Sequence, residues 1–70
     1  MSVPSDLAEL SSLRAQVEDL TARLVEVAER YGTTPDSAVA ADLFAAERAL
    51  FAAARSLDRA RNHLVDLDER

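Results

Sequence analysis

Glycine and proline, the residues that most often interrupt helices, are concentrated at one point of the chain. Gly32 is the only glycine, and Pro35 is the only proline besides Pro4. A glycine after a periodic stretch is a common left-handed helix stop, and Thr34 before Pro35 is typical of a helix start. The sequence therefore predicts an all-α antiparallel hairpin that occupies the whole chain, 1–70. Its predicted elements are a helix over about 5–31, a turn at 32–34 and a helix over about 35–68.

The apolar residues on both sides of this turn are spaced alternately three and four apart, as in a coiled-coil seam. The alternation lasts for three heptads in each stretch. Folding about Pro35 pairs residues whose numbers sum to about 70, so that Leu20 meets Leu50 and Leu24 meets Ala46. The predicted seam consists of Leu10, Leu13, Val17, Leu20, Leu24 and Val27 in the first helix and Leu43, Leu50, Leu57 and Leu64 in the second. A further row in the second helix, Val39, Ala46, Ala53, Ala60 and Leu67, completes it.

The second predicted helix carries more apolar surface than one seam can cover. Phe44, Phe51 and Val65 lie seven and fourteen residues apart on a second face. Neither phenylalanine can turn toward the first helix while Leu43 and Leu50 already do. Aromatic residues in an exposed patch are typical of an interface. The predicted interface consists of Phe44, Phe51, Val65, Ala40 and Ala54.

Three arrangements would cover or use this face. Two copies could pack as a homodimeric four-helix bundle, which suits an assembly or adaptor subunit. Alternatively, the face docks a different protein, as in a sequestering regulator of the antitoxin-like or anti-transcription-factor kind. A third arrangement is a monomer whose second helix rolls to share its phenylalanines with the first. We predict the homodimer, because a lone hairpin of 70 residues buries too little apolar surface to be more than marginally stable.

Charge and composition limit the partners. The chain has 13 acidic and 8 basic residues and a net charge of -5, so nucleic-acid binding is not expected. The basic stripe from Arg48 through Arg55 and Arg59 to Arg61 could hold an anion, but a salt-bridged solvent face is the simpler interpretation. No secretory start and no membrane-spanning stretch is visible. We expect a cytoplasmic protein without membrane contact, and the alanine-rich, lysine-free composition is typical of a GC-rich bacterial genome.

Few residues could carry catalysis. The chain has no cysteine, so a disulfide and a thiolate metal site are excluded. The sole histidine, His63, has no nucleophile one helical turn away to activate. Residues 10–30 resemble the first helix of the all-helical chorismate mutases, in which arginines matching Arg14 and Arg30 would contact substrate carboxylates. That family also needs a lysine and a third helix, which this chain lacks. We therefore predict a non-enzymatic protein without a cofactor or metal.

Overall fold

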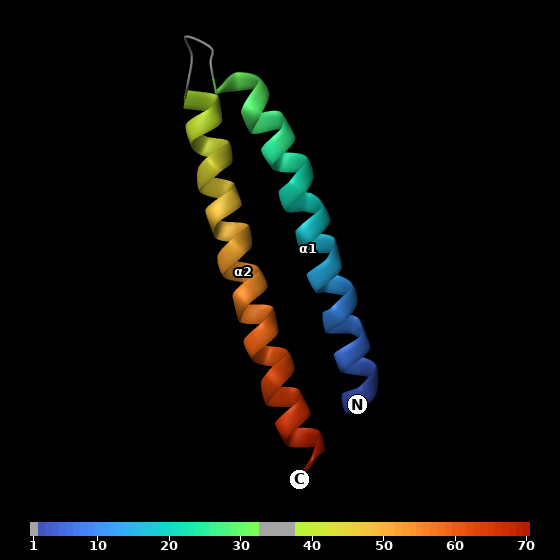
Figure 1. The fold of residues 1–70 in the computed structure, drawn as a ribbon. Helices are drawn as coiled ribbons and strands as arrows, with labels where there is room; N and C mark the ends of the chain where they lie inside the picture. Colours follow the sequence, from blue (N-terminus) through green and yellow to red (C-terminus); the bar gives the residue numbers. More distant parts are fainter. Residues whose placement is uncertain (1, 33–37) are drawn as a thin grey trace.

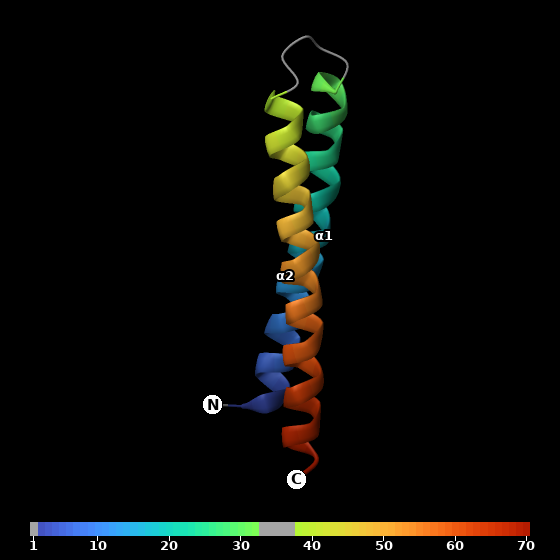
Figure 2. The same cartoon turned by 90° about the vertical axis from the view of Figure 1, so that its left-hand side faces the viewer.

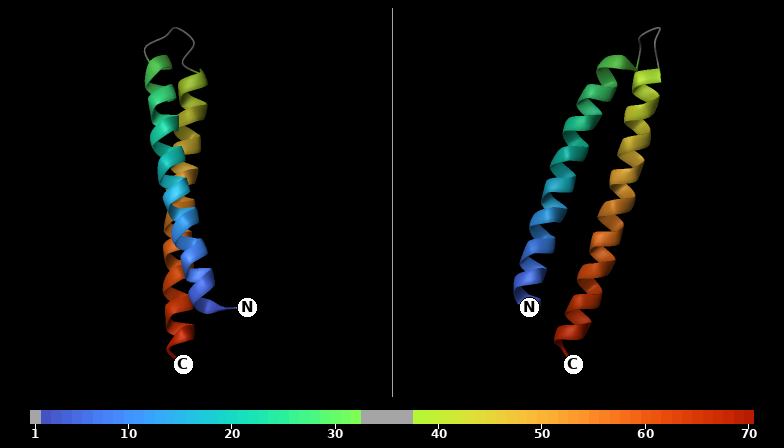
Figure 3. Two further views of the ribbon diagram at one scale, coloured as in Figure 1. Left: turned by 90° about the vertical axis from the view of Figure 1, so that its right-hand side faces the viewer. Right: turned by 180° about the vertical axis from the view of Figure 1, so that it is seen from behind.

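The computed structural model describes residues 2–32 and 38–70. Helix α1 (Val3–Tyr31) and helix α2 (Ala38–Asp68) run antiparallel and side by side, with both termini at the same end (Figures 1 and 3). The Cα atoms extend over 56 × 15 × 14 Å, so the hairpin is a rod. In the described ranges, neither helix has a segment apolar and long enough to cross a membrane. The predicted all-α hairpin is confirmed.

Helix α1 begins two residues earlier than predicted. Ser2 is in an extended conformation, and its side-chain oxygen accepts a hydrogen bond of 3.4 Å from the backbone nitrogen of Ser5. Pro4 is tolerated in the first turn, because a backbone N–H there would have no partner within the helix. Asp6 in the first turn and Arg30 in the last turn complement the helix dipole. These local signals extend the helix back to Val3.

The two helix ends at the turn follow the prediction only in part. Helix α1 ends at Tyr31 as predicted, but Gly32 has φ -63° and ψ -22°, so the expected left-handed stop is wrong. A Cβ atom at Gly32 would meet only backbone oxygens at 3.7 and 3.8 Å, so the chain leaves the helix here without needing a glycine. The predicted turn residues 33–34 and the predicted helix start at 35 lie outside the described residues.

In the described part of the chain, small residues form the only fully covered part of the contact between the helices. Among the described residues, only Ala28, Ala40 and Ala54 are buried, and no large side chain is completely covered. The larger apolar residues around these alanines are half-buried. In the view of Figure 2 α1 lies largely behind α2 and its N-terminal part emerges beside it, so the two described helices form a single layer. The half-buried seam residues are Val3, Leu7, Leu10, Val17 and Leu24 in α1 and Leu43, Leu50, Leu57 and Leu64 in α2.

Both helices are rolled relative to the predicted seam. One row of each helix lies where it was predicted, but the second row differs. In the predicted α1 row of Leu13, Leu20 and Val27, the two leucines are exposed at the edge and Val27 is half-buried, whereas the row one residue later, Arg14, Thr21 and Ala28, faces α2. In α2 the observed second row is Ala40, Glu47 and Ala54, and the predicted row, Val39, Ala46, Ala53, Ala60 and Leu67, is exposed except for the half-buried Ala46.

Two physical features accompany this roll. The alanines bring the helix backbones close together because they have almost no side chain to accommodate. The polar members of the inner row have partners: Arg14 Nε donates to Asp58 Oδ1 at 3.0 Å across the seam, and Thr21 Oγ1 donates to the Val17 carbonyl oxygen at 2.7 Å. A polar group can lie in a helix contact when it is hydrogen-bonded. Thus Arg14 and Thr21 occupy seam positions that the apolar pattern assigned to leucines.

Candidate protein-interaction surfaces

The roll leaves two open grooves along the hairpin. One groove, which we call the phenylalanine groove, is centred on Phe51, Val25 and Ala22 and has a volume of about 630 Å³. The other is lined by Leu20, Leu24, Val27, Arg23, Ala46, Ala49 and Leu50 and has a volume of about 650 Å³. The grooves share no lining residue, and the seam lies between them. Because the two grooves are similar in volume, they differ mainly in the chemistry of the residues that line them.

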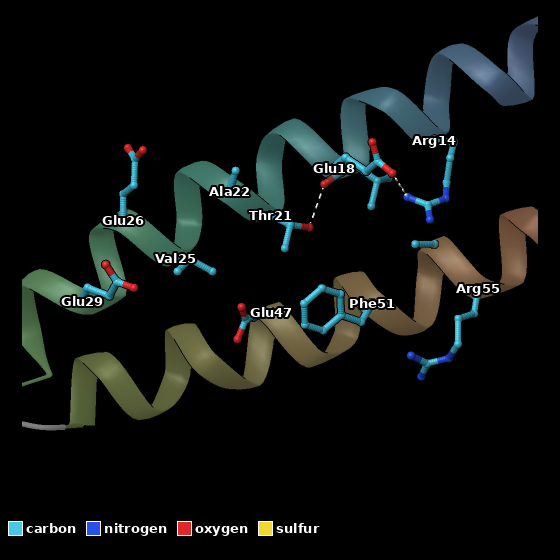
Figure 4. A pocket seen from close by; sticks show the side chains of 12 residues that line it. Arg14, Glu18, Thr21, Ala22, Val25, Glu26, Glu29, Glu47, Phe51 and Arg55 are labelled. Carbon is cyan, nitrogen blue, oxygen red and sulfur yellow. Dashed lines mark hydrogen bonds and ion pairs between the residues drawn. The ribbon is translucent and has the colours of Figure 1, made fainter.

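The phenylalanine groove is apolar only at its centre. Phe51 and Glu47 of α2 lie between the two helices, and Thr21 and Val25 of α1 point toward α2 (Figure 4). The Phe51 side chain is nevertheless 47% exposed, because no residue of α1 closes over its outer face. The site can therefore receive an apolar side chain from outside, which would lie against Phe51 and Val25.

Charges surround this apolar centre and divide it into two ends. Glu26, Glu29 and Glu47 lie toward one end, and Arg14 and Arg55 lie toward the other (Figure 4). Among the described residues, none of these three glutamates forms an ion pair. Their end of the groove therefore carries uncompensated negative charge.

Arg14 is held by two carboxylates. Its Nη1 lies 2.7 Å from Glu18 Oε1, while Nε and Nη2 donate to the two oxygens of Asp58 at 3.0 and 3.5 Å. The hydrogen bond with Asp58 raises the pKa of the Arg14 guanidinium above its already high usual value. The side chain is therefore charged at any physiological pH, and it links α1 to α2 rather than offering a free cation in the groove.

The opposite side of the hairpin carries two rows of aliphatic residues. We call it the leucine–alanine face and define it by Leu13, Leu20 and Val27 of α1 and by Val39, Ala46, Ala53, Ala60 and Leu67 of α2. Members of each row are seven residues apart or multiples of seven, and Leu20, Val27 and Ala46 line the same groove, so the two rows follow one side of the rod. The one charged residue that lines this groove, Arg23, lies 3.6 Å from Asp19. Within this groove the face offers apolar residues with one charged residue, Arg23, which lies near the exposed Asp19.

The residues of the predicted interface do not share one outer surface. Phe51 is exposed, and Phe44 and Val65 are half-buried. Ala40 and Ala54 are only 4% and 7% exposed, because the roll turns them toward α1. Ala40 and Ala54 were predicted to lie on an outer interface, but they pack against α1 instead, and neither alanine is available to a partner. The leucine–alanine face was not predicted from the sequence, because the heptad spacing of its α1 row is also the spacing of residues that pack inside a two-helix seam.

Three of the four arginines in the basic stripe lie on one side of α2, and Arg61 does not. Arg48, Arg55, Arg59 and Arg61 are all exposed, and Arg59 Nη2 donates to Ser56 Oγ at 2.9 Å. At about 100° per residue, Arg48, Arg55 and Arg59 lie within roughly 40° of one another, whereas Arg61 lies roughly 120° around the helix from Arg55. The single histidine, His63, is exposed, and in the described part of the chain no three acidic or histidine side chains gather as metal ligands would.

Comparison with known proteins adds nothing to this geometry. No family model, no curated protein and no solved structure matches the chain. The two grooves and the seam between them are therefore the features that indicate a function. The contrast between a charged and an apolar groove of similar size is the main chemical feature of the described surface.

Proposed function

We propose that this chain is a non-enzymatic helical hairpin that acts through protein–protein contact, as a cytoplasmic assembly or adaptor subunit. In this proposal two copies pack into a homodimeric four-helix bundle. The observation that carries it is the state of the core: among the described residues only three alanines are buried, and every large apolar side chain keeps some exposure. A second pair of helices would cover side chains that a single hairpin leaves in water.

The accessible surface supports the same proposal. The chain exposes 5113 Å², whereas a folded monomer of 7.6 kDa is expected to expose roughly 4,300 Å². The difference, roughly 800 Å², equals the area that each partner buries in a standard protein–protein interface. The radius of gyration is 16.1 Å, against about 11 Å for a globular chain of 70 residues. Both values describe an elongated rod that exposes more surface than a compact chain of this size.

A sequestering regulator, antitoxin-like or directed against a transcription factor, is the second candidate. The observation that favours it is Phe51, which is half-exposed in an open groove beside Glu26, Glu29 and Glu47. A target helix with one apolar face and flanking lysine or arginine residues would complement this groove, because its cations would meet the three carboxylates. In this case the Phe44 and Phe51 side of the hairpin would bind a different protein.

Concentration dependence of unfolding tests the homodimer. If folding is coupled to pairing, the melting temperature followed by circular dichroism rises with protein concentration, by several degrees between about 5 and 500 μM. Identical melting temperatures with a sharp transition at both concentrations would contradict the proposal. The regulator instead predicts a target protein that co-purifies with the wild-type chain from its source cells, is lost from the Phe51→Glu variant and is retained by the Arg59→Ala control.

A further inference from the structure

We infer that a second copy of this chain covers the leucine–alanine face, so that the two hairpins meet there and the phenylalanine groove stays open. This inference rests on the proposed homodimer, since it names the surface through which the two copies pair. It departs from the sequence-based prediction, which assigned the pairing to Phe44, Phe51 and Val65.

The first argument is the cost of removing each surface from water. The rows of the leucine–alanine face contain only alanine, valine and leucine, and Leu20 at its centre is 49% exposed. Covering apolar side chains is favourable, whereas burying a charge without a partner is costly. A contact on the phenylalanine groove would have to dehydrate Glu26, Glu29 and Glu47. Only the leucine–alanine face can be covered without that penalty.

The second argument is symmetry. When the two-fold axis runs parallel to the rod, each level of one hairpin faces the same level of the other, so like charges are brought together. Pairing through the phenylalanine groove would bring two sets of three unpaired glutamates into one interface, in a chain whose net charge is already -5. On the opposite side the charged lining residue, Arg23, is close to Asp19 at the edge. For a two-fold axis parallel to the rod, electrostatics therefore separates the two surfaces: the phenylalanine groove repels its own copy and the leucine–alanine face does not.

The third argument is shape. Leu20 and Leu50 line the same groove, so Leu20 lies at a height between Ala46 and Ala53 of the neighbouring helix. A two-fold axis parallel to the rod would place α1 of each copy against α2 of the other. The leucine row of α1 would then pack against the partner's alanine row, and large side chains against small ones fill a helix interface without voids. The same symmetry gives a bundle with both turns at one end.

A matched pair of substitutions tests this inference. Leu20 and Phe51 are large apolar residues of nearly equal exposure, 49% and 47%, on opposite sides of the hairpin. Light scattering on the full chain should show that Leu20→Glu weakens self-association at least about 100-fold, since each dimer would bury two charges, while Phe51→Glu remains a dimer. The opposite result, a dimeric Leu20→Glu variant and a monomeric Phe51→Glu variant, overturns the inference and leaves the proposed dimer intact. A monomeric wild-type chain contradicts the proposed function itself.

Thiol labelling covers the case in which the Leu20→Glu variant fails to fold. The chain has no cysteine, so Ala53→Cys and Ala22→Cys variants would each carry one thiol, the first on the leucine–alanine face and the second lining the phenylalanine groove. Above the dissociation constant, maleimide should label the Ala53→Cys variant about tenfold more slowly than the Ala22→Cys variant, and dilution should remove the difference by mass action. Equal labelling rates at all concentrations, with the wild-type chain dimeric, would overturn the inference.

Discussion

The leucine–alanine face and the phenylalanine groove lie on opposite sides of one seam, and they differ in chemistry rather than in size. Their grooves have similar volumes, and the central residues Leu20 and Phe51 are almost equally exposed. One side carries rows of aliphatic residues, while the other has an aromatic centre surrounded by glutamates and arginines. Exposed apolar area alone therefore does not identify a self-association surface. The charge around that area decides which partner can cover it.

The difference arises from the choice of seam. Each helix has two rows that could complete the contact, and the hairpin uses the row with smaller or polar members, such as Ala28, Thr21 and Ala54. The leucines at 13 and 20 are left at the edge. Large apolar residues that are not used inside the hairpin remain available to a second copy.

The largest expected effect belongs to the seam, on which both surfaces depend. Leu57→Ala should lower the free energy of unfolding by about 2–3 kcal/mol, because it removes a half-buried side chain and leaves a void between α1 and α2. Urea denaturation followed by circular dichroism measures this change. A loss below ~1 kcal/mol would mean that the seam does not hold the helices together. The positions of the phenylalanine groove and the leucine–alanine face would then not be determined by the seam.

The next effect sharpens the comparison between the two sides. Leu20→Ala should weaken the dimer about tenfold or more, because the substitution removes apolar contact from both copies. Phe51→Ala should change the dimer dissociation constant less than about twofold, since its side chain lies outside the proposed contact. Sedimentation velocity over a dilution series gives both constants, and equal weakening by the two variants would erase the distinction between the surfaces.

A smaller effect is expected for the ion pair that links the helices beside the phenylalanine groove. A double-mutant cycle with Arg14→Ala and Asp58→Ala should give a small favourable coupling between the two side chains, well below the effect of Leu57→Ala, since the pair is partly exposed to solvent. Thermal unfolding at low and at 1 M salt measures it, and the coupling should fall at high salt. A coupling that salt does not change would mean that the hydrogen-bond geometry, rather than charge, holds Arg14 in the seam.

The smallest effect is expected at the outer edge of the same groove. Arg55 points away from α1 and forms no ion pair in the described chain (Figure 4). Arg55→Ala should therefore change the free energy of unfolding by less than about 0.5 kcal/mol and leave the dimer mass unaltered. A larger loss, measured by the same urea titration, would show that the charges of the phenylalanine groove contribute to the hairpin itself.

The fold followed from local signals in the sequence. The positions of Gly32 and Pro35 predict two helices and one connection, and α1 and α2 fulfil this prediction. The register of the two helices could also be predicted from the sequence. The predicted pairs, Leu20 with Leu50 and Leu24 with Ala46, line the same groove in the structure. Short-range residue preferences and a single turn are sufficient to establish both.

The side of each helix that faces inward could not be predicted in the same way. Heptad spacing allows two seams that share one row, and the row of Leu13 and Leu20 has the stronger apolar pattern. The structure uses the alternative, in which Arg14 reaches Asp58 across 44 residues of sequence and the alanines bring the backbones close together. These are long-range contacts that no local pattern contains. The same rotation buried Ala40 and Ala54, which the sequence assigned to an outer surface.

The measurement that tests the central claim most directly is the mass of the native chain in solution. Sedimentation equilibrium at micromolar concentration and physiological salt should give twice 7.6 kDa, because the half-exposed seam and one apolar side are covered only when two hairpins pair. Dilution should shift the mass toward the single chain without leaving a folded remainder. A mass of 7.6 kDa at every concentration, with full helicity by circular dichroism and a sharp unfolding transition, would contradict the homodimer.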